Sequence, residues 1–461
     1  MSRLYFGLIW LLALSCAAAA VPSSTTLSTS PTGLATFGQP VNLTATVAPS
    51  IATGKVTFYD GVTFLGVGML VHGQASLSTT FIAAGHRSLT AFYSGDGTHG
   101  SSVSMGVALT VNPVASLTFA AAPGTPTAVQ NQGFMAIGDF NGDGKPDLAV
   151  VDSVDSLVRV FLGNGTGGFT EATGSPYATS YNPTNVAVGD FNGDGNQDLA
   201  ITTANGGLYQ LTVLLGNGSG SFAKAAGSPF ALGGIIQQFV VGDFNGDGKA
   251  DLAVSNDYTS IAILLGTGDG GFSAATSYPT GAGPYTLAVG DFNNDGKADI
   301  AVANNVGGGV TILLGNGTGG FTTATGSPFV SGVYPISLAV GDFNGDGMAD
   351  LAISGDIRNA SLTILLGNGT GGFTEAPGNP ILLEAYLGNI VVADFNGDGK
   401  ADLAVASQGS VHVLLGDGSG GFTQGLGSPL SVPNGGWQLL VADFNGDGRA
   451  DLVGFGLAAR V

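Results

Sequence analysis

The sequence predicts an all-β protein in which a β-sandwich is followed by a seven-bladed β-propeller. Three observations lead to this fold class. A nine-residue acidic motif recurs seven times at a period near 50 residues, which is the size of one four-stranded propeller blade. Between the motifs lie runs of Val, Ile and Leu that end in glycine-rich turns and show no helical period. Before them lie alternating Thr, Ser and Val runs at the spacing of a sandwich.

The N-terminal segment 1–20 has the layout of a secretory signal peptide: one Arg, an apolar run, then small residues up to Ala20. We therefore expect the mature protein to be secreted, extracellular or held at the cell surface. The single cysteine, Cys16, lies in this segment, so we expect no disulfide in the mature chain. Acylation of Cys16 in a lipoprotein is an alternative, although Ala13-Leu14-Ser15 is a poor match for such a site.

The charge balance excludes some classes of partner. The chain has 461 residues, with 32 acidic residues against 12 Lys and Arg, and its net charge is −20. This surplus of negative charge argues against nucleic acid and anionic membranes as partners. No run after the signal segment is long enough to span a bilayer, so we expect no transmembrane segment in the mature chain. We also expect a monomer.

The repeated motif reads DFNxDGxxD. Each copy follows an apolar run such as VAVGDF and precedes another such as DLAVV, so it joins two strands. A third run ends in a turn such as LLGNGTGGF, where Asn-Gly and Gly-Gly accept positive φ at little cost. One repeat thus predicts three clear strands and a weaker fourth after the Phe. Such a repeat buries its apolar faces only against its neighbours, which favours a closed ring.

We assign residues 25–112 to the sandwich and residues 116–461 to the propeller. The segment 116–124 is similar to the outer strand of later repeats and could close the seventh blade. After the seventh motif the sequence has no run of the LLGNGxGGF type. We therefore expect the last blade to be incomplete and to lack its third strand, or the sequence to stop short.

Each motif places side-chain oxygens at positions 1, 3, 5 and 9 and a glycine at position 6, where the chain can reverse sharply. Calcium takes six to eight oxygen ligands, and the carbonyl at position 7 would add one. The seven copies bring 21 of the 32 acidic residues close together, which opposes folding unless a cation neutralises them. The alternative for any single copy is an Asx turn without metal.

We predict up to seven Ca²⁺ ions and prefer Ca²⁺ to Mg²⁺, because Mg²⁺ demands a stricter octahedron. An EF-hand is excluded by the strand-like flanks. The candidate ligands are Asp139, Asn141, Asp143, Lys145 and Asp147; Asp190, Asn192, Asp194, Asn196 and Asp198; Asp243, Asn245, Asp247, Lys249 and Asp251; Asp291, Asn293, Asp295, Lys297 and Asp299; Asp342, Asn344, Asp346, Met348 and Asp350; Asp394, Asn396, Asp398, Lys400 and Asp402; and Asp443, Asn445, Asp447, Arg449 and Asp451, with position 7 contributing only its carbonyl.

Residues 116–461 resemble the FG-GAP or VCBS repeats of integrin-α-type β-propellers, whose calcium loops read DxDxDGxxD. Here Asn replaces Asp at position 3 in all seven copies, so weaker sites are expected. Residues 25–112 resemble bacterial Ig-like domains, on the motifs GKVTFYDG, LTAFYSGDG and LTVNP. The resemblance implies an Ig-like β-sandwich and a propeller with its calcium loops on one face and the connections between blades on the other.

Those connections carry aromatic residues six to nine positions before a motif. They could stack on a sugar or anchor a protein; alternatively, they fill the gaps between blades. The residues are Tyr181, Tyr285, Tyr334, Tyr386 and Trp437.

Catalytic constellations are scarce. None of the four histidines accompanies an evident nucleophile, and most carboxylates are committed to the motifs. We therefore expect a non-enzymatic calcium-binding adhesion or recognition protein, whose ligand is an extracellular protein or glycan. The alternatives are a secreted carbohydrate-active hydrolase or lyase built on a propeller frame, and a purely structural envelope component.

Overall fold

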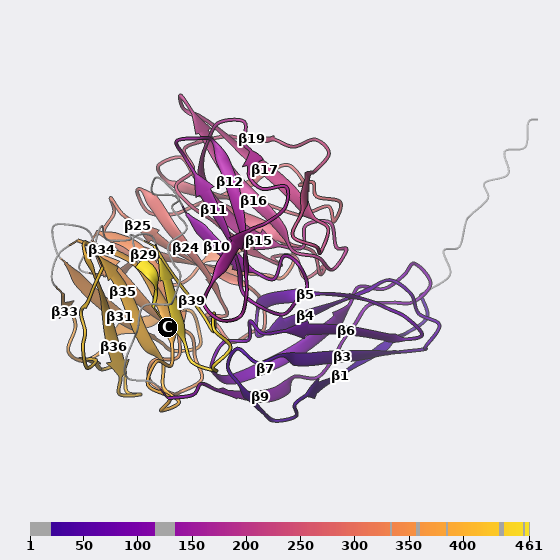
Figure 1. Ribbon diagram of the computed structural model, residues 1–461, viewed down its shortest axis with the longest axis horizontal. Helices are drawn as coiled ribbons and strands as arrows, with labels where there is room; N and C mark the ends of the chain where they lie inside the picture. The colour runs from indigo at the N-terminus through magenta and orange to yellow at the C-terminus, as the bar shows by residue number, and fades with distance from the viewer. Residues whose placement is uncertain are drawn as a thin grey trace, which may run out of the picture.

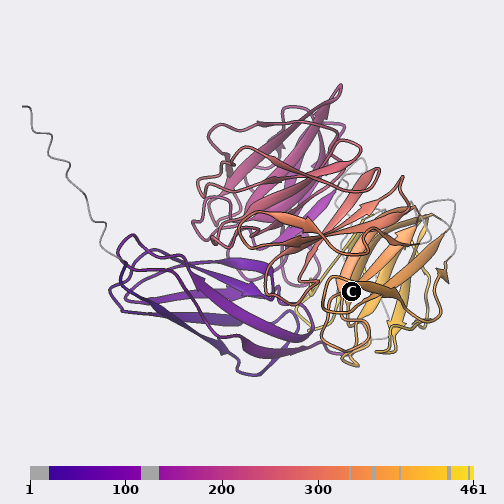
Figure 2. The ribbon, with the colours of Figure 1, turned by 180° about the vertical axis from the view of Figure 1, so that it is seen from behind.

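The structure is a computed structural model that describes residues 20–115, 134–331, 334–355, 360–383, 386–432, 438–454 and 457–460. These residues form strands, turns and loops without a helix, which confirms the predicted all-β class; none of them forms a helix that could cross a membrane. Figures 1 and 2 show the N-terminal sandwich lying against one side of a ring of sheets. The predicted signal segment lies outside the described residues, except for Ala20.

The sandwich consists of two packed sheets. One pairs β1 (Ser24–Ser30), β3 (Val41–Ala48) and β6 (Gln74–Thr79); the other runs β2 (Leu34–Thr36), β9 (Val107–Asn112), β7 (Gly85–Tyr93), β4 (Lys55–Asp60), β5 (Thr63–Met69), with β8 (Ser102–Val103) against β7. Alternate residues of β3, from Val41 to Val47, are buried, which is the period of a strand with one buried face. They pack on Phe58 and Leu89 of the other sheet.

Seven more sheets follow along the chain, and within each the first strands pair antiparallel in chain order. Where a fifth strand is present, it pairs with the third strand. The strands of the first three sheets are β10 (Met135–Gly138), β11 (Asp147–Asp152), β12 (Leu157–Gly163), β13 (Phe169–Glu171) and β14 (Tyr177–Ala178); β15 (Asn182–Gly189), β16 (Asp198–Asn205), β17 (Leu208–Gly216), β18 (Phe222–Lys224) and β19 (Phe230–Leu232); and β20 (Phe239–Gly242), β21 (Asp251–Asn256), β22 (Ser260–Leu264) and β23 (Thr276–Pro279).

The remaining four sheets repeat this order. Their strands are β24 (Pro284–Gly290), β25 (Asp299–Asn304), β26 (Gly309–Gly315), β27 (Phe321–Thr323) and β28 (Phe329–Val330); β29 (Pro335–Gly341), β30 (Asp350–Gly355), β31 (Ser361–Gly367), β32 (Phe373–Glu375) and β33 (Ile381–Leu382); β34 (Leu387–Ala393), β35 (Asp402–Ser407), β36 (Ser410–Gly416), β37 (Phe422–Gln424) and β38 (Leu430–Ser431); and β39 (Leu439–Ala442), β40 (Asp451–Gly454) and β41 (Leu457–Arg460).

The last sheet corrects one expectation. Its third strand is present, because β41 pairs antiparallel with β40. Four residues at the end of the chain are enough to extend along β40, even without the LLGNGxGGF run that forms this strand elsewhere. The segment 116–124, expected to supply an outer strand, lies outside the described residues. A complete seventh blade therefore stays a prediction.

A phenylalanine occupies position 2 of each motif; we call it the loop phenylalanine, and in six of the seven motifs it links one sheet to the next within the described residues. Its backbone carbonyl accepts a hydrogen bond of 2.8–3.0 Å from a glycine N–H in the hairpin that follows the third strand of the next sheet. Its ring packs edge to face, at 5.5–5.8 Å between centroids, on the phenylalanine that ends the same hairpin. The ring pairs are Phe140–Phe222, Phe191–Phe272, Phe244–Phe321, Phe292–Phe373, Phe343–Phe422 and Phe444–Phe169.

The pair Phe444–Phe169 joins the seventh sheet to the first and closes the ring. Gly167 N donates to Phe444 O at 3.0 Å across the same junction. On the inner strands, Gln438 Nε2 donates to Met135 O at 3.0 Å, and Gln438 Oε1 accepts from Met135 N at 2.5 Å. Closure thus uses the contacts that join the first six sheets to one another, together with one amide side chain.

The sandwich docks on the acidic motifs through alternate residues of β4. Lys55 Nζ donates to Asn192 O at 3.3 Å, Thr57 Oγ1 to Gly248 O at 2.9 Å, and Tyr59 Oη to Asp243 Oδ2 at 2.5 Å. After β9, Val114 N donates to Gly448 O at 2.7 Å. The sandwich therefore covers part of the motif-bearing end of the ring.

Phe444→Ala tests the closing contact. The side chain is 2% exposed, so its truncation should lower the free energy of unfolding by about 3–5 kcal/mol, because it leaves a cavity between the first and seventh sheets. The measurement is urea unfolding of the full chain. Val330→Ala, at an exposed position of β28, is the control and should change the same quantity by less than about 0.5 kcal/mol. Equal effects of the two variants would contradict ring closure at this junction.

Candidate metal loops and the opposite rim

Each acidic motif forms the turn between the first and second strands of its sheet, as predicted. In the first loop, Asp147 at position 9 opens β11 and pairs with Gly138, the last residue of β10. Gly142 and Gly144, at positions 4 and 6, have φ of 72° and 78°. These left-handed conformations allow the sharp reversal that the glycine at position 6 predicted.

The aspartate at position 9 is the most buried group of the loop. The Asp147 side chain is fully buried, and both of its oxygens accept backbone hydrogen bonds of 2.8 Å: Oδ2 from Phe140 N and Oδ1 from Gly163 N. It therefore ties the loop phenylalanine to the end of the third strand. The same pair of bonds recurs at Asp198, Asp251, Asp299, Asp350 and Asp402.

The third strand needs a glycine where this carboxylate reaches it. A Cβ on Gly163 would collide with the carbonyl oxygen of Pro146, at position 8 of the loop. The equivalent glycines of the next five sheets are crowded in the same way by the carbonyl at position 8 of their own loops. This close approach explains the glycine that follows Leu-Leu in the repeated LLG sequence.

Burial raises the pKa of Asp147 to about 7; the backbone donors at Gly163 and Phe140 oppose this rise, and the nearby charges of Asp139 and Asp143 add to it. The position-9 pKa is raised in all seven loops, mainly by burial. Since the folded-state pKa exceeds the unfolded value, the stability present at low pH is lost as the pH rises towards 7. A positive charge near the loop would offset this loss at neutral pH.

The other oxygens of the loop bend around its backbone. Asp139 at position 1 accepts from Asp143 N at 3.1 Å and from Gly144 N at 2.9 Å. Asn141 at position 3 also accepts from Asp143 N, at 2.9 Å, so the side chains at positions 1 and 3 share one donor. Asp143 in turn accepts from Lys145 N at 3.0 Å. The side chains at positions 1, 3 and 5 are thus held at one turn.

Position 7 adds positive charge in five of the seven loops. The side-chain nitrogen of Lys145, Lys249, Lys297, Lys400 or Arg449 lies 3.0–4.0 Å from an oxygen of the aspartate at position 5. The second and fifth loops have no basic residue here; instead the position-3 amide donates to that aspartate, from Asn192 to Asp194 at 3.0 Å and from Asn344 to Asp346 at 2.9 Å. In the five loops with a basic residue, three carboxylates and one basic side chain leave a net negative charge that one divalent cation balances.

The donor set fits a hard cation, although the described residues contain no formed metal centre with three or more acidic or histidine side chains. Carboxylate, amide and carbonyl oxygens are the ligands that calcium prefers, and the loops offer neither thiolate nor imidazole. In the first loop each accepting side-chain oxygen receives one backbone hydrogen bond and carries a second lone pair. In four other loops the position-1 Oδ1 accepts two backbone hydrogen bonds, at Asp243, Asp342, Asp394 and Asp443. The metal ligands stay a prediction.

The four described tyrosines of the predicted ligand face lie at the starts of the first strands β15, β24, β29 and β34, opposite the acidic loops. Tyr181, Tyr285, Tyr334 and Tyr386 are 37–41% exposed. Trp437 lies outside the described residues. The hairpins between second and third strands end at the same rim, and they expose Val154, Leu208, Tyr258 and Val306 by 65–68%. The rim thus carries an inner set of tyrosines and an outer set of apolar residues.

Two features of the site were not found from the sequence. One is the docking of β4 on the loops, which joins residues 184 positions apart at Tyr59 and Asp243. The other is a cleft between the sandwich and the first two loops. The sequence does contain one sign of the cleft: only the second loop has amide side chains, Asn196 and Gln197, at positions 7 and 8.

Comparison with known families matches both parts of the chain. Residues 26–112 match the bacterial Ig-like domain (group 3). The FG-GAP-like repeat matches six overlapping stretches: 139–201, 190–254, 243–302, 291–353, 342–405 and 394–454. The sequence is 31% identical to integrin alpha-4 of Xenopus laevis in an alignment of 151 residues, which covers 28% of this chain and 14% of that protein.

Solved structures that align with this chain include a lectin from Agrocybe aegerita that recognises non-reducing terminal N-acetylglucosamine. It is 18% identical, with a TM-score of 0.47 over 81% of this chain and 88% of the lectin. A protein from Lactobacillus plantarum is 15% identical, with a TM-score of 0.47 over 83% of this chain and 98% of its own. The repeat matches, which extend from residue 139 to residue 454, show that the chain belongs to the FG-GAP-like repeat family.

Proposed function

We propose that the chain is a secreted or cell-surface, non-enzymatic recognition protein. Calcium-loaded loops hold the ring together, and the opposite rim binds an extracellular protein or glycan. The observation that carries this proposal is the difference between the two ends of the ring. One end holds the acidic loops and the docked sandwich, whereas the other exposes the inner tyrosines and the outer apolar residues. A rim of exposed apolar side chains is typical of an interaction surface.

Calcium fits the acidic loops because it would supply the positive charge that their buried carboxylates lack. The aspartate at position 9 stays fully or almost fully buried in all seven loops, and burial of an unpaired charge is costly. The basic residue at position 7 reaches position 5, not position 9. Within the described part of the chain, the basic side chains therefore leave the buried carboxylate unpaired, and a bound Ca²⁺ would complete the balance.

Calcium removal tests the metal half of the proposal, with Asp346→Asn in the fifth loop as the informative variant. In excess calcium the variant should melt at a lower temperature than the wild type, because one charged ligand is lost. In EDTA the melting temperature of the variant should equal or exceed that of the wild type, since the same substitution relieves repulsion between carboxylates in an empty loop. Calcium at 100 times its Kd should stabilise each loop by about 2.7 kcal/mol. The measurement is scanning calorimetry of the full chain.

Asp269→Asn is the matched control, because Asp269 is an exposed aspartate of a hairpin turn outside the acidic loops. Its effect should be the same in calcium and in EDTA. A melting temperature of the wild type that does not respond to EDTA, or an Asp346→Asn effect of equal size in both conditions, would show that the motifs are turns without metal.

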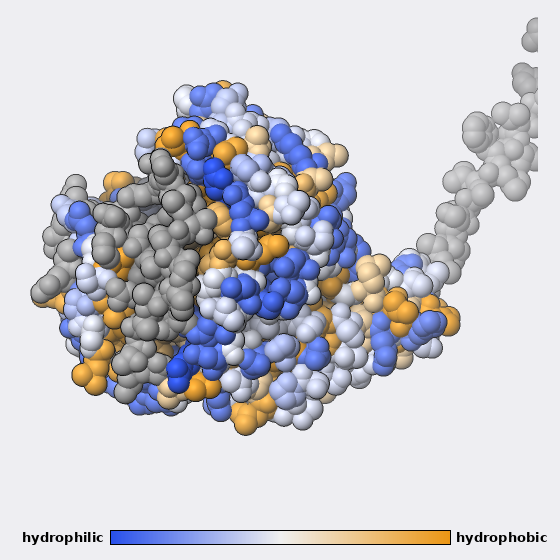
Figure 3. All heavy atoms as spheres, in the orientation of Figure 1, coloured by the Kyte–Doolittle hydropathy of each residue, from blue (hydrophilic) through white to orange (hydrophobic). Residues whose placement is uncertain are grey.

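Paired substitution of the rim tyrosines tests the ligand half. Tyr285→Ser/Tyr386→Ser should abolish binding of the full chain to arrays of glycans and extracellular proteins, because both rings lie at the rim opposite the acidic loops. Ile51→Ser is the control: Ile51 is 76% exposed in the turn that leads from β3 to β4. Figure 3 shows apolar atoms at the end of the sandwich that lies away from the ring. No binding by the wild type, or equal binding by the double variant, would contradict a ligand site at the rim.

A further inference from the structure

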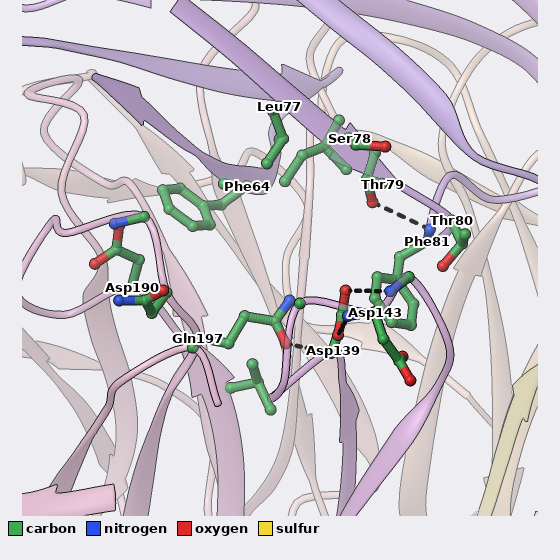
Figure 4. Close-up of a pocket in the computed structure, with 18 of the residues that line it drawn as sticks. Phe64, Leu77, Ser78, Thr79, Thr80, Phe81, Asp139, Asp143, Asp190 and Gln197 are labelled. Atoms are coloured by element: carbon green, nitrogen blue, oxygen red, sulfur yellow. Dashed lines mark hydrogen bonds between the residues drawn. The ribbon is translucent and has the colours of Figure 1, made fainter. Parts of the chain in front are cut away.

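A cleft of about 390 Å³ lies between the sandwich and the first two acidic loops. One wall comes from β5, β6 and the turn after β6, and the other from the loops that begin at Asp139 and Asp190. Figure 4 shows the two walls facing each other, with Phe64 and Leu77 on one side and Gln197 on the other. The volume is within the range of small-molecule sites. This cleft is at the opposite end of the ring from the tyrosine rim.

The loop wall departs from the repeat where it faces the cleft. Positions 7 and 8 of the second loop are Asn196 and Gln197, and both line the cleft. In the other six loops, position 7 is Lys, Arg or Met and position 8 is Ala or Pro. Those loops form the same turn without amides, so the turn itself does not require Asn196 or Gln197.

Gln197 has a fixed orientation. Its Oε1 accepts a hydrogen bond of 2.7 Å from Asp139 N in the first loop (Figure 4), which leaves the Nε2 group as a donor. No described residue accepts a hydrogen bond from this Nε2. An amide held in this way can donate to a ligand oxygen without reorganisation, which is a favourable property of a binding group.

The sandwich wall is mixed in character. The side chains of Phe64 and Phe81 are partly exposed beside the cleft, together with Leu65 and Leu77. The hydroxyl of Thr80 is buried and makes no hydrogen bond within the described residues, although Thr80 is 9% exposed and lines the cleft. This hydroxyl faces the interior, so the polar groups that the sandwich wall offers to a ligand are few.

The charges around the cleft select the class of ligand. Asp139, Asp143 and Asp190 line it and no Lys, Arg or His does, so an anion is disfavoured. If the loops hold calcium, as proposed above, these three carboxylates face the metal and are neutralised, so an organic cation is also disfavoured. The amide groups and the aromatic side chains of the cleft suit a neutral molecule with many hydroxyls and one apolar face.

We propose that this interdomain cleft binds a neutral carbohydrate. The apolar face of a sugar ring would lie on the aromatic wall, and its hydroxyls would meet Gln197 and Asn196. The sandwich wall offers aromatic carbons, and the loop wall offers amides and carboxylates. The two walls therefore suit the apolar and the polar parts of a sugar ring. The site needs the sandwich and the ring together, since each supplies one wall.

The test is isothermal titration of the full chain, in calcium, with the methyl glycosides of glucose, galactose, mannose and N-acetylglucosamine. Cadaverine is the probe for an organic cation. At least one glycoside should bind, and Gln197→Ala should weaken that binding at least tenfold. This substitution suits the loop, because alanine occupies position 8 in five of the other loops. Ser78→Trp, at an exposed position that lines the cleft, should block binding without removing a buried group.

The variant Tyr285→Ser/Tyr386→Ser separates the cleft from the rim and should leave the affinity for the glycoside unchanged. Binding that only the rim variant weakens would overturn the cleft as the site, while it would support the rim. Absence of binding by all four glycosides would overturn the proposal, as would binding of cadaverine in their place. Unchanged affinity in both Gln197→Ala and Ser78→Trp would overturn it as well. Melting curves establish that each variant is folded.

Discussion

The bond network around the loop phenylalanine is the interaction on which the ring depends. In the first loop, Phe140 N donates to the buried Asp147, and Phe140 O accepts from Gly220 in the next sheet. The phenyl ring packs on Phe222 of that sheet. A turn that would otherwise be local therefore bonds two sheets. The same arrangement recurs from the second sheet to the fifth and again at the junction of the seventh sheet with the first.

This arrangement has an electrostatic cost, because it places a carboxylate at the most buried point of each loop. Because of this cost, the two ends of the ring differ in charge. The end that carries the loops requires positive charge and is partly covered by the sandwich through Lys55 and Tyr59. The other end is free of the acidic loops and carries the exposed tyrosines. In the function that we propose, one end maintains the fold and the other meets the ligand.

The strands and turns of each repeat could be predicted from the sequence, because they depend on residues that are close together along the chain. The spacing of the motifs predicted the turns between first and second strands, and the glycine at position 6 predicted the reversal seen at Gly144. Contacts between distant residues could not be predicted. The need for glycine at position 163 comes from the carbonyl of Pro146, which approaches it only when the strands are paired. The contact of β4 with the acidic loops likewise depends on how the two domains pack. The third strand of the last sheet was wrongly expected to be missing, because the search relied on a sequence motif that β41 does not have.

The most direct measurement for the central claim is the calcium content of the folded chain. The protein would be stripped with chelator, returned to calcium and separated from free ion by gel filtration before elemental analysis. The account predicts several calcium ions per chain, up to seven, and fewer by one in a variant with one loop disabled through Asp350→Asn. A folded, closed ring that retains no calcium would contradict it, because the buried carboxylates would then be tolerated without a cation.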